Sequence, residues 1–285
     1  MKRIAFAALV LALSIGAYGK TISGYVSDAK SSEKLGYATV MLKHHDVGMI
    51  CDSCGFFKLE IPDKAAGDSV EFRYIGYEPT LISLNAMTKE TNVALKQQSK
   101  KLKEITVKTP HKFKTMKSGK KHTSGLFLSF LGGINGIDSK GDTYGFESKN
   151  GGKRTWLKSV GFFIKQTDNM LSRMKFRINI YDMVNVKKAP SSDLLCVQNE
   201  PIFFEYRKED VADEKYTYNL PKPLLIPDHA LVEIEFLENI PSTETISFKS
   251  NIMGGNTWYK DEEHHKWDKC PIATPFFVEY IREKK

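Results

Sequence analysis

Residues 230–237 read ALVEIEFL, a stretch in which apolar and acidic side chains alternate. The apolar positions are Leu231 or Val232, Ile234 and Phe236. Glu233 and Glu235 stand between them. A period of two is typical of a β-strand, where successive side chains point to opposite faces. We therefore predict a strand with one face in a core, and with Glu233 and Glu235 in water.

The same alternation recurs in two runs earlier in the chain, which a short gap separates. Thr155–Lys165 reads TWLKSVGFFIK and Arg173–Tyr181 reads RMKFRINIY. Prolines fall between these runs, where they interrupt no ladder of hydrogen bonds. The pattern predicts a jelly-roll-like β-sandwich over residues 122–285.

Residues 20–95 are also rich in short strand-like runs. These runs are Thr21–Ser27, Leu35–Lys43, Phe56–Ile61, Ser69–Tyr74, Pro79–Leu84 and Thr91–Leu95. Glycines separate them at short intervals, and no stretch keeps a helical period. Short strands at this spacing indicate an antiparallel sandwich over residues 20–95. The fold class is therefore all-β, with two sandwich domains.

Residues 96–121 differ from their surroundings in composition, with ten lysines against Glu104 alone. The formal net charge of the whole chain is +8, so its basicity is concentrated in this segment. Such a run is usually solvated, and we predict a Lys-rich linker at 96–121. We expect no nucleic-acid partner, and at most a weak contact with anionic lipid of about 1 kcal/mol per lysine near the surface.

The first nineteen residues have the three parts of a secretory signal. Lys2 and Arg3 are followed by an apolar run from Ile4 to Ile15, and then by the small residues of Ala17-Tyr18-Gly19. Cleavage after Gly19 would make Lys20 the first residue, and no cysteine stands there to take a lipid. We expect a protein exported to the periplasm or cell-envelope surface that is not a lipoprotein.

The N-terminal part resembles a known family. Its stretches GYVSDAKSSEKLGYATVMLK, CDSCGFFKLEIP and GDSVEFRYIGYEP are similar to the carboxypeptidase-like regulatory domain. The matching positions are Gly24, Val26, Asp28, Ala38, Thr39, Val40, Gly55, Phe57, Phe72, Tyr74, Ile75, Gly76 and Tyr77. Together with LKEITVK at Leu102–Lys108, they extend the resemblance over residues 21–108.

This resemblance implies a transthyretin/Ig-like sandwich of the kind found in front of many TonB-dependent receptors. It implies an accessory role and no catalysis. The chain departs from the family at Cys51 and Cys54, where threonine and aspartate are usual. About 160 residues follow, which is too few for a receptor plug and barrel. The C-terminal domain resembles the uncharacterised sandwich that often follows this module in short exported proteins.

One cluster has the chemistry of a metal site, the run Asp261-Glu262-Glu263-His264-His265. Carboxylates and imidazoles bind divalent metals, and the candidate ligands are Asp261, Glu263, His264 and His265. Neighbouring residues of an extended segment point apart, however, so a polar hairpin tip is the competing interpretation. The standard hydrolase motifs are absent. We expect no metal, no cofactor and no catalytic residue.

Aromatic residues flank this run. Trp258, Tyr259 and Trp267 could stack on a sugar or grip a partner peptide. They could equally close one end of a sandwich core.

The chain has four cysteines. In an oxidising compartment they favour disulfides. Cys51–Cys54 with Cys196–Cys270 is the pairing that keeps each bridge inside one domain. A zinc site made by Cys51 and Cys54 with His44 and His45 is a second interpretation.

These observations predict a non-catalytic, exported envelope protein that acts as a binding or scaffold module. Its partner would be an unidentified envelope protein or glycan. One alternative is a metal-dependent hydrolase centred on Asp261–His265. Another is a carbohydrate-binding module that uses Trp258 and Trp267.

The signal sequence gives a first test. We expect the protein recovered from the envelope of its host to begin at Lys20, because signal peptidase cuts after small residues at the −3 and −1 positions. Intact-mass measurement with N-terminal peptide mapping checks this. Recovery of the chain with Met1 intact in the envelope fraction would contradict export by cleavage.

Overall fold

The structure is a computed structural model of the 285-residue chain. It describes residues 20–98, 112–119, 127–131, 140–184, 186, 189–190, 194, 196–241, 243–249, 257–260, 266–269 and 275–284. Within these ranges the regular structure is β-strand, apart from three short 3₁₀ turns at Asp63–Ala65, Leu84–Ala86 and Lys208–Asp210. None of the described helices is long and apolar enough to cross a membrane.

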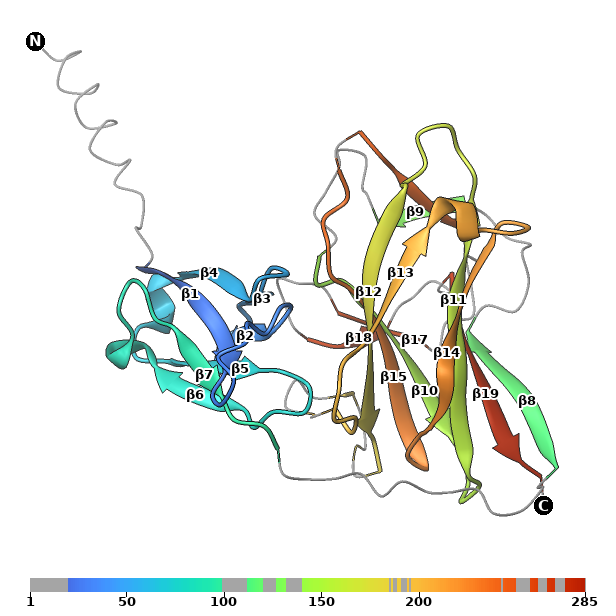
Figure 1. Ribbon diagram of the computed structural model, residues 1–285, viewed down its shortest axis with the longest axis horizontal. Helices are drawn as coiled ribbons and strands as arrows, with labels where there is room; N and C mark the ends of the chain where they lie inside the picture. The colour runs from blue at the N-terminus through green and yellow to red at the C-terminus, as the bar shows by residue number, and fades with distance from the viewer. Residues whose placement is uncertain are drawn as a thin grey trace, which may run out of the picture.

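Two sheets form the N-terminal domain (Figure 1). The strands are β1 (Lys20–Asp28), β2 (Thr39–Leu42), β3 (Gly48–Ile50), β4 (Phe56–Ile61), β5 (Ser69–Arg73), β6 (Thr80–Ser83) and β7 (Val93–Leu95). One sheet has the order β4-β1-β7 and the other β3-β2-β5-β6. Between them Phe57 and Phe72 meet edge to face, with ring centroids 5.3 Å apart. The two-sheet sandwich expected for this part of the chain is confirmed.

Two matching residues of the family motif are bonded to each other here. The Tyr77 hydroxyl donates to Asp28 Oδ2 at 2.8 Å, while Oδ1 accepts the backbone N–H groups of Lys30 and Ser31, both at 2.7 Å. The Ser31 N–H, the Tyr77 hydroxyl and the Lys30 N–H lower the pKa of Asp28 to about 2. The aspartate therefore closes the turn after β1 and ties it to the residues that follow β5.

The C-terminal domain is a larger sandwich. Its strands are β8 (Phe113–Gly119), β9 (Phe127–Leu131), β10 (Thr143–Lys149), β11 (Thr155–Lys165), β12 (Arg173–Asp182), β13 (Ile202–Arg207), β14 (Lys215–Leu225), β15 (His229–Phe236), β16 (Ile246–Lys249), β17 (Thr257–Lys260), β18 (Asp268–Lys269) and β19 (Phe276–Glu283). One sheet has the order β13-β12-β15-β10-β17-β18, and the other β8-β19-β11-β16-β9, with β14 paired to β11.

The connections between these sheets are those of a jelly roll. The chain changes sheet at each step from β10 to β11, β11 to β12, β13 to β14 and β14 to β15. Eight strands make the roll, in the orders β8-β19-β11-β14 and β13-β12-β15-β10. Two interlocked Greek keys produce this arrangement. The jelly-roll-like prediction is confirmed.

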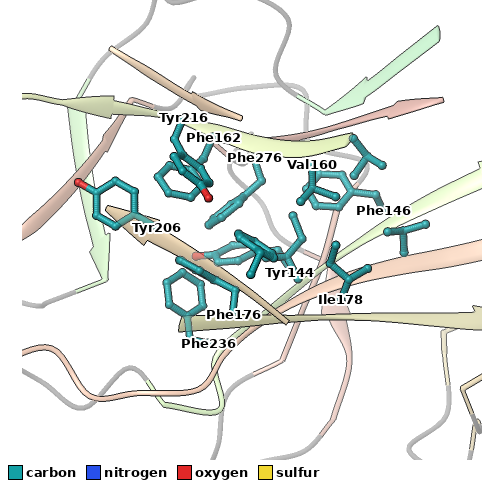
Figure 2. Close-up of a cluster of buried hydrophobic side chains, with 14 of the residues drawn as sticks. Tyr144, Phe146, Val160, Phe162, Phe176, Ile178, Tyr206, Tyr216, Phe236 and Phe276 are labelled. Carbon is teal, nitrogen blue, oxygen red and sulfur yellow. The ribbon is translucent and has the colours of Figure 1, made fainter. Parts of the chain in front are cut away.

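Aromatic rings fill the space between the two sheets of the roll (Figure 2). Phe162 is fully buried. Its ring centroid lies 5.1–5.7 Å from those of Phe176, Tyr206, Tyr216, Phe248 and Phe276. Contacts of this kind, between strands of both sheets, give the sandwich its shape.

Part of the predicted linker is a strand instead. Residues 113–119 form β8, which pairs with β19 along its whole length. β8 lies at the edge of its sheet, where exposed lysines commonly protect the edge from pairing with another strand. The composition of β8 therefore resembles that of a solvated linker. At the other end Gln98 donates its backbone N–H to the Gly76 carbonyl at 2.8 Å. Residues 99–111 of the predicted linker lie outside the described ranges.

The aromatic core gives a second prediction. We expect Phe162→Ala to lower the free energy of unfolding of the C-terminal domain by about 3–5 kcal/mol, because it leaves a large cavity at the centre of the roll. Phe113→Ala is the matched control, since Phe113 is 42% exposed on the edge strand, and should cost less than about 1 kcal/mol. Urea unfolding followed by tryptophan fluorescence measures both. Equal losses in the two variants would show that Phe162 does not occupy the core.

Candidate functional site

The outer face of the sheet that contains β12, β15, β10 and β17 carries a grid of charged and polar side chains. One row across the sheet consists of Arg177, Glu235, Thr143 and Lys260. The next row consists of Asn179, Glu233, Gly145 and Trp258. Positions two apart on a strand share a face, so both rows point the same way, opposite to the aromatic core.

Arg177 and Glu235 form a buried ion pair at this face. The Arg177 Nη2 and Nε atoms lie 2.7 and 2.8 Å from Glu235 Oε2, and Asn179 Nδ2 donates to the same oxygen at 2.8 Å. Arg177 is 3% exposed. Burial alone would raise the pKa of Glu235, but the charge of Arg177 outweighs it and the pKa is lowered. Glu235 therefore stays ionised.

Glu233, two residues earlier, has a different environment. Its side chain is fully buried, and Lys260 Nζ approaches its Oε1 at 3.6 Å. Burial raises the pKa of Glu233, although the charge of Lys260 opposes the shift. The two carboxyls on this face are therefore shifted in opposite directions.

The expectation that Glu233 and Glu235 face water is wrong. Both are buried, because the N-terminal domain and Trp267 cover the face that a free-standing sandwich would expose to solvent. Alternation correctly placed them opposite to the core, but it carried no information about a second domain lying on that face.

Specific contacts hold the N-terminal domain on this sheet. Arg177 Nη1 donates to the carbonyl oxygen of Tyr37 at 2.6 Å. The Tyr37 ring lies 5.7 Å from that of Phe203, and both belong to an apolar cluster with Ile50 and Leu237. Lys175 Nζ lies 4.9 Å from the Tyr37 ring centroid. The domain contact thus combines apolar packing with a buried charge.

The backbones of the two domains approach each other closely at Gly76. Its φ is +83°, and a Cβ built there would lie 1.8 Å from the carbonyl oxygen of Asn199. No residue with a side chain fits without moving one domain. Gly76 belongs to the YIGY stretch of the family motif, so that stretch faces the jelly roll.

A cavity of about 90 Å³ lies between the domains. From the N-terminal side its lining includes Arg73, Tyr74 and Tyr77, and from the jelly roll Arg177, Asn179, Tyr181, Cys196, Glu235, Lys260 and Trp267. This is the principal candidate site of the described chain, because charged, aromatic and amide groups from both domains converge on it. Sequence analysis missed it. The sequence signal that could have revealed it is charge at two-residue spacing on two strands. Arg173–Tyr181 carries positive charges at this spacing, and Ala230–Leu237 carries negative ones.

The structure places the predicted aromatic residues in packing positions. Trp258 and Trp267 are buried in a cluster with Met183 and Leu231. Tyr259 is half-buried, and its hydroxyl donates to Asp142 Oδ1 at 3.3 Å. Of the three, Trp267 lines the cavity between the domains, with Lys260 Nζ 4.9 Å from its ring centroid.

The other predicted sites have different outcomes. Asp261–His265 and Cys270 lie outside the described residues, so the metal cluster stays a prediction, whereas the free thiol of Cys196 contradicts the expected Cys196–Cys270 bridge. Cys51, Cys54 and Cys196 are free thiols in the structure. The expected Cys51–Cys54 bridge is not formed, because Cys51 is buried in the core whereas Cys54 is exposed in the turn.

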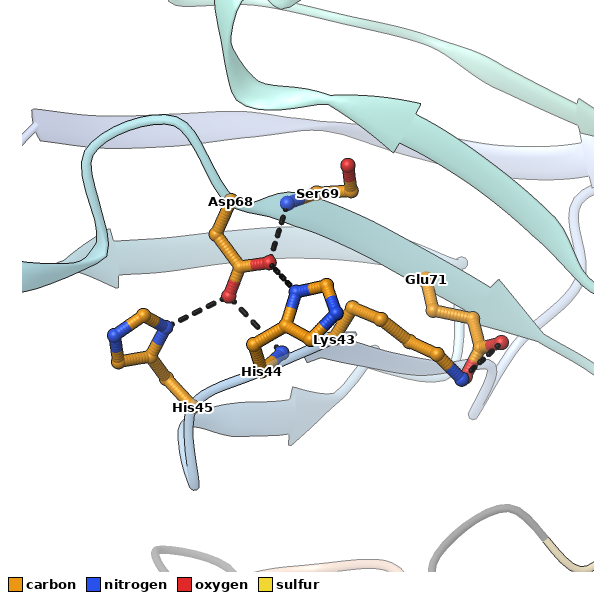
Figure 3. Close-up of polar contacts among 6 residues, drawn as sticks. All are labelled: Lys43, His44, His45, Asp68, Ser69 and Glu71. Atoms are coloured by element: carbon orange, nitrogen blue, oxygen red, sulfur yellow. Dashed lines mark hydrogen bonds and ion pairs between the residues drawn. The ribbon is translucent and has the colours of Figure 1, made fainter.

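A second polar cluster lies at the tip of the β2–β3 hairpin (Figure 3). His44 Nδ1 and His45 Nδ1 each lie 2.7 Å from one oxygen of Asp68, whose side chain is 2% exposed. Asp68 also accepts the backbone N–H groups of His44 and Ser69, at 3.1 and 2.7 Å. Burial raises the pKa of Asp68, but the bonds from His45, Ser69 and His44 outweigh it and hold it far below its ordinary value.

The proposed zinc site of these histidines with Cys51 and Cys54 is not assembled. The histidines occupy the hairpin turn, whereas Cys51 follows β3 at the opposite end and donates its N–H to Ala38. Among the described residues no group of three histidine, cysteine or acidic side chains is placed to hold a metal. Asp68 instead fastens the hairpin turn to the start of β5.

Asp68 gives a prediction about stability and pH. At pH 7 we expect Asp68→Asn to destabilise the N-terminal domain by about 2–3 kcal/mol, because four hydrogen bonds lose a charged acceptor. The folded-state pKa is depressed, so this stability is present above the ordinary pKa of 3.8 and is lost as the pH falls below it. The difference between wild type and variant should therefore narrow in acid.

Asp46→Asn is the matched control, because Asp46 is exposed in the same turn. Thermal unfolding from pH 7 down to pH 3 measures all three proteins. A variant difference that is constant across this range would mean that Asp68 does not act through its charge.

Comparison with known proteins locates the N-terminal domain. A solved structure titled "Structural basis for the promiscuous specificity of the carbohydrate- binding modules from the beta-sandwich super family" aligns over 88% of this chain and 99% of its own, at 9% identity and a TM-score of 0.17. A likeness this weak carries no inference. A search of curated proteins found no match. Residues 22–107 match the family model of the CarboxypepD_reg-like domain. The N-terminal domain is therefore a CarboxypepD_reg-like domain, which is a non-catalytic domain type, followed by a jelly-roll sandwich.

Proposed function

We propose that this protein is a non-catalytic, exported component of the cell envelope, which binds or organises an envelope partner. Its two domains act in this role as one rigid unit. The observation that carries the proposal is the contact between the domains, in which a regulatory-type domain covers the polar face of the jelly roll.

The chemistry of that face also supports a binding role. Carboxyls with divergent pKa values are the usual components of an acid–base pair. Here, however, Glu235 Oε2 is engaged by Arg177 and Asn179, and fully buried Glu233 is not part of the cavity lining. A general acid or base must reach a substrate atom within hydrogen-bond distance. Glu235 holds Arg177 where it bonds to the N-terminal domain, and this favours a structural role over proton transfer.

The domain contact fits a module that presents a composite surface. A buried charge that crosses between domains restricts their relative motion, because undocking would leave Arg177 with one hydrogen-bond acceptor fewer. Rigid units bind with a smaller loss of conformational entropy than hinged ones. The partner would therefore recognise residues of both domains together.

We expect Gly76→Ala to separate the domains, because the new Cβ collides with the Asn199 carbonyl. Gly67→Ala is the matched control. Gly67 also has a positive φ, +89°, but nothing lies within 4 Å of a Cβ built there. Both variants carry the same backbone strain of about 1–2 kcal/mol, so a difference between them reports the domain contact. Small-angle scattering should show a larger radius of gyration for Gly76→Ala alone.

The same pair of variants tests function. Tagged mature protein, crosslinked in the envelope of its host and analysed by quantitative mass spectrometry, should retain the same partner in wild type and Gly67→Ala. Gly76→Ala should lose it. Equal capture by Gly76→Ala, with its domains shown to be separated, would contradict a composite surface. A hydrolase activity of the purified chain that disappears in the His264→Ala/His265→Ala double variant would contradict the non-catalytic role.

A further inference from the structure

Unpaired buried polar atoms gather at and beside the cavity between the domains. Asn179 is 3% exposed, and its Oδ1 accepts no hydrogen bond. Its neighbour in register is Glu233, which is fully buried and paired with Lys260, whose Nζ lies 3.6 Å from its Oε1. Trp258 Nε1, in the same row across the sheet, is a buried donor without an acceptor.

Such atoms are uncommon in folded proteins. More than nine-tenths of buried polar groups have a partner, and each one left without costs about 1–3 kcal/mol. Asn179 lines the cavity, whereas Glu233 and Trp258 do not. The unfilled acceptor of Asn179 is the expected result if a polar molecule in the cavity completes the bonding there. That molecule must donate to an amide oxygen.

The charge around the cavity restricts the kind of molecule. Arg177 is matched by Glu235 at 2.7 Å and Lys260 by Glu233 at 3.6 Å. Arg73, the third cation that lines the cavity, is paired with Glu71. The charged side chains that line the cavity are therefore each paired, so a charged ligand would leave its own charge uncompensated in a desolvated site. A neutral ligand is favoured.

The volume of the cavity and the chemistry of its walls restrict the kind of ligand further. About 90 Å³ corresponds to roughly three water molecules, enough for the hydroxyl-bearing edge of a sugar ring whose remainder stays outside. Trp267 supplies an aromatic wall for the apolar carbons of such a ring. Hydroxyl groups both donate and accept, which matches a site that offers an amide oxygen, tyrosine hydroxyls and cationic donors.

We propose that the cavity between the domains binds one residue of a neutral sugar, one of whose hydroxyl groups donates to Asn179 Oδ1 while the apolar carbons of its ring pack against Trp267. This inference rests on the proposed binding function and names the ligand class for the same site. The ring would enter between the YIGY stretch of the N-terminal domain and the outer face of the jelly roll.

Isothermal titration calorimetry with defined sugars tests this. The probes are glucose, galactose, mannose, fucose, N-acetylglucosamine and, as a charged counterpart, N-acetylneuraminic acid. We expect saturable binding of at least one neutral sugar and none of the acid. Asn179→Leu keeps the approximate volume and removes the acceptor, so its affinity should fall about tenfold or more.

Tryptophan substitutions supply a matched pair. Trp267→Leu removes the aromatic wall of the cavity and should weaken binding several-fold, whereas Trp156→Phe, on the other sheet beside Phe113, should leave it unchanged. Near-ultraviolet circular dichroism of each variant shows that its fold is intact. Quenching of tryptophan fluorescence by the bound sugar should persist in Trp156→Phe.

Failure of the sugar-binding inference can be distinguished from failure of the proposed function. If no neutral sugar binds saturably to the wild type, ordered water alone fills the cavity and the inference is wrong. If an envelope protein is still captured by Asn179→Leu as by wild type, the binding module stands without the sugar site. Tight binding of N-acetylneuraminic acid alone would overturn the argument from charge balance.

Discussion

Arg177 connects the two halves of this protein through a single guanidinium group. Two of its nitrogens hold Glu235 on the neighbouring strand, and the third donates to the Tyr37 carbonyl of the other domain. Removing a partner from a buried ion pair costs about 3–5 kcal/mol, because the remaining charge is left desolvated. The geometry of the domain contact therefore depends on this group, and so does the cavity that the contact encloses.

The contact explains why a sandwich face carries charged residues without exposing them. In the assembled protein Glu233 and Glu235 are both buried, and their pKa values are shifted in opposite directions. The charge of Arg177 lowers the pKa of Glu235 despite its burial, whereas burial dominates at Glu233 and raises its pKa. The same contact leaves Asn179 with an unused acceptor. The polar character of the site is thus a property of the assembled pair of domains.

The internal hydrogen bonds of the N-terminal domain also shape the surface that contacts the jelly roll. Its motif residues Asp28 and Tyr77 are hydrogen bonded, which fixes the segment after β5 in place. That segment includes Gly76, whose missing side chain permits contact with Asn199. A motif that serves the internal structure of one domain thereby also shapes the surface that the second domain meets.

The sequence by itself determined the local and repetitive features. Alternation in Thr155–Lys165, Arg173–Tyr181 and Ala230–Leu237 predicted strands, and the family motif predicted the N-terminal sandwich. These features could be predicted because a period of two and a glycine in a turn depend only on a few neighbouring residues. Composition was less reliable: the lysines of residues 113–119 indicated a linker, although they protect the edge strand β8.

Only the tertiary structure decided what covers each surface. Nothing near Glu233 in the chain shows that Trp267 and a separate domain lie over it, and nothing near Cys51 and Cys54 shows that one points into a core and the other into solvent. The candidate site combines residues more than one hundred positions apart, such as Arg73 and Arg177. Burial and charge pairing at such distances depend on how whole sheets pack, so the face that alternation predicted to be exposed is a buried polar surface.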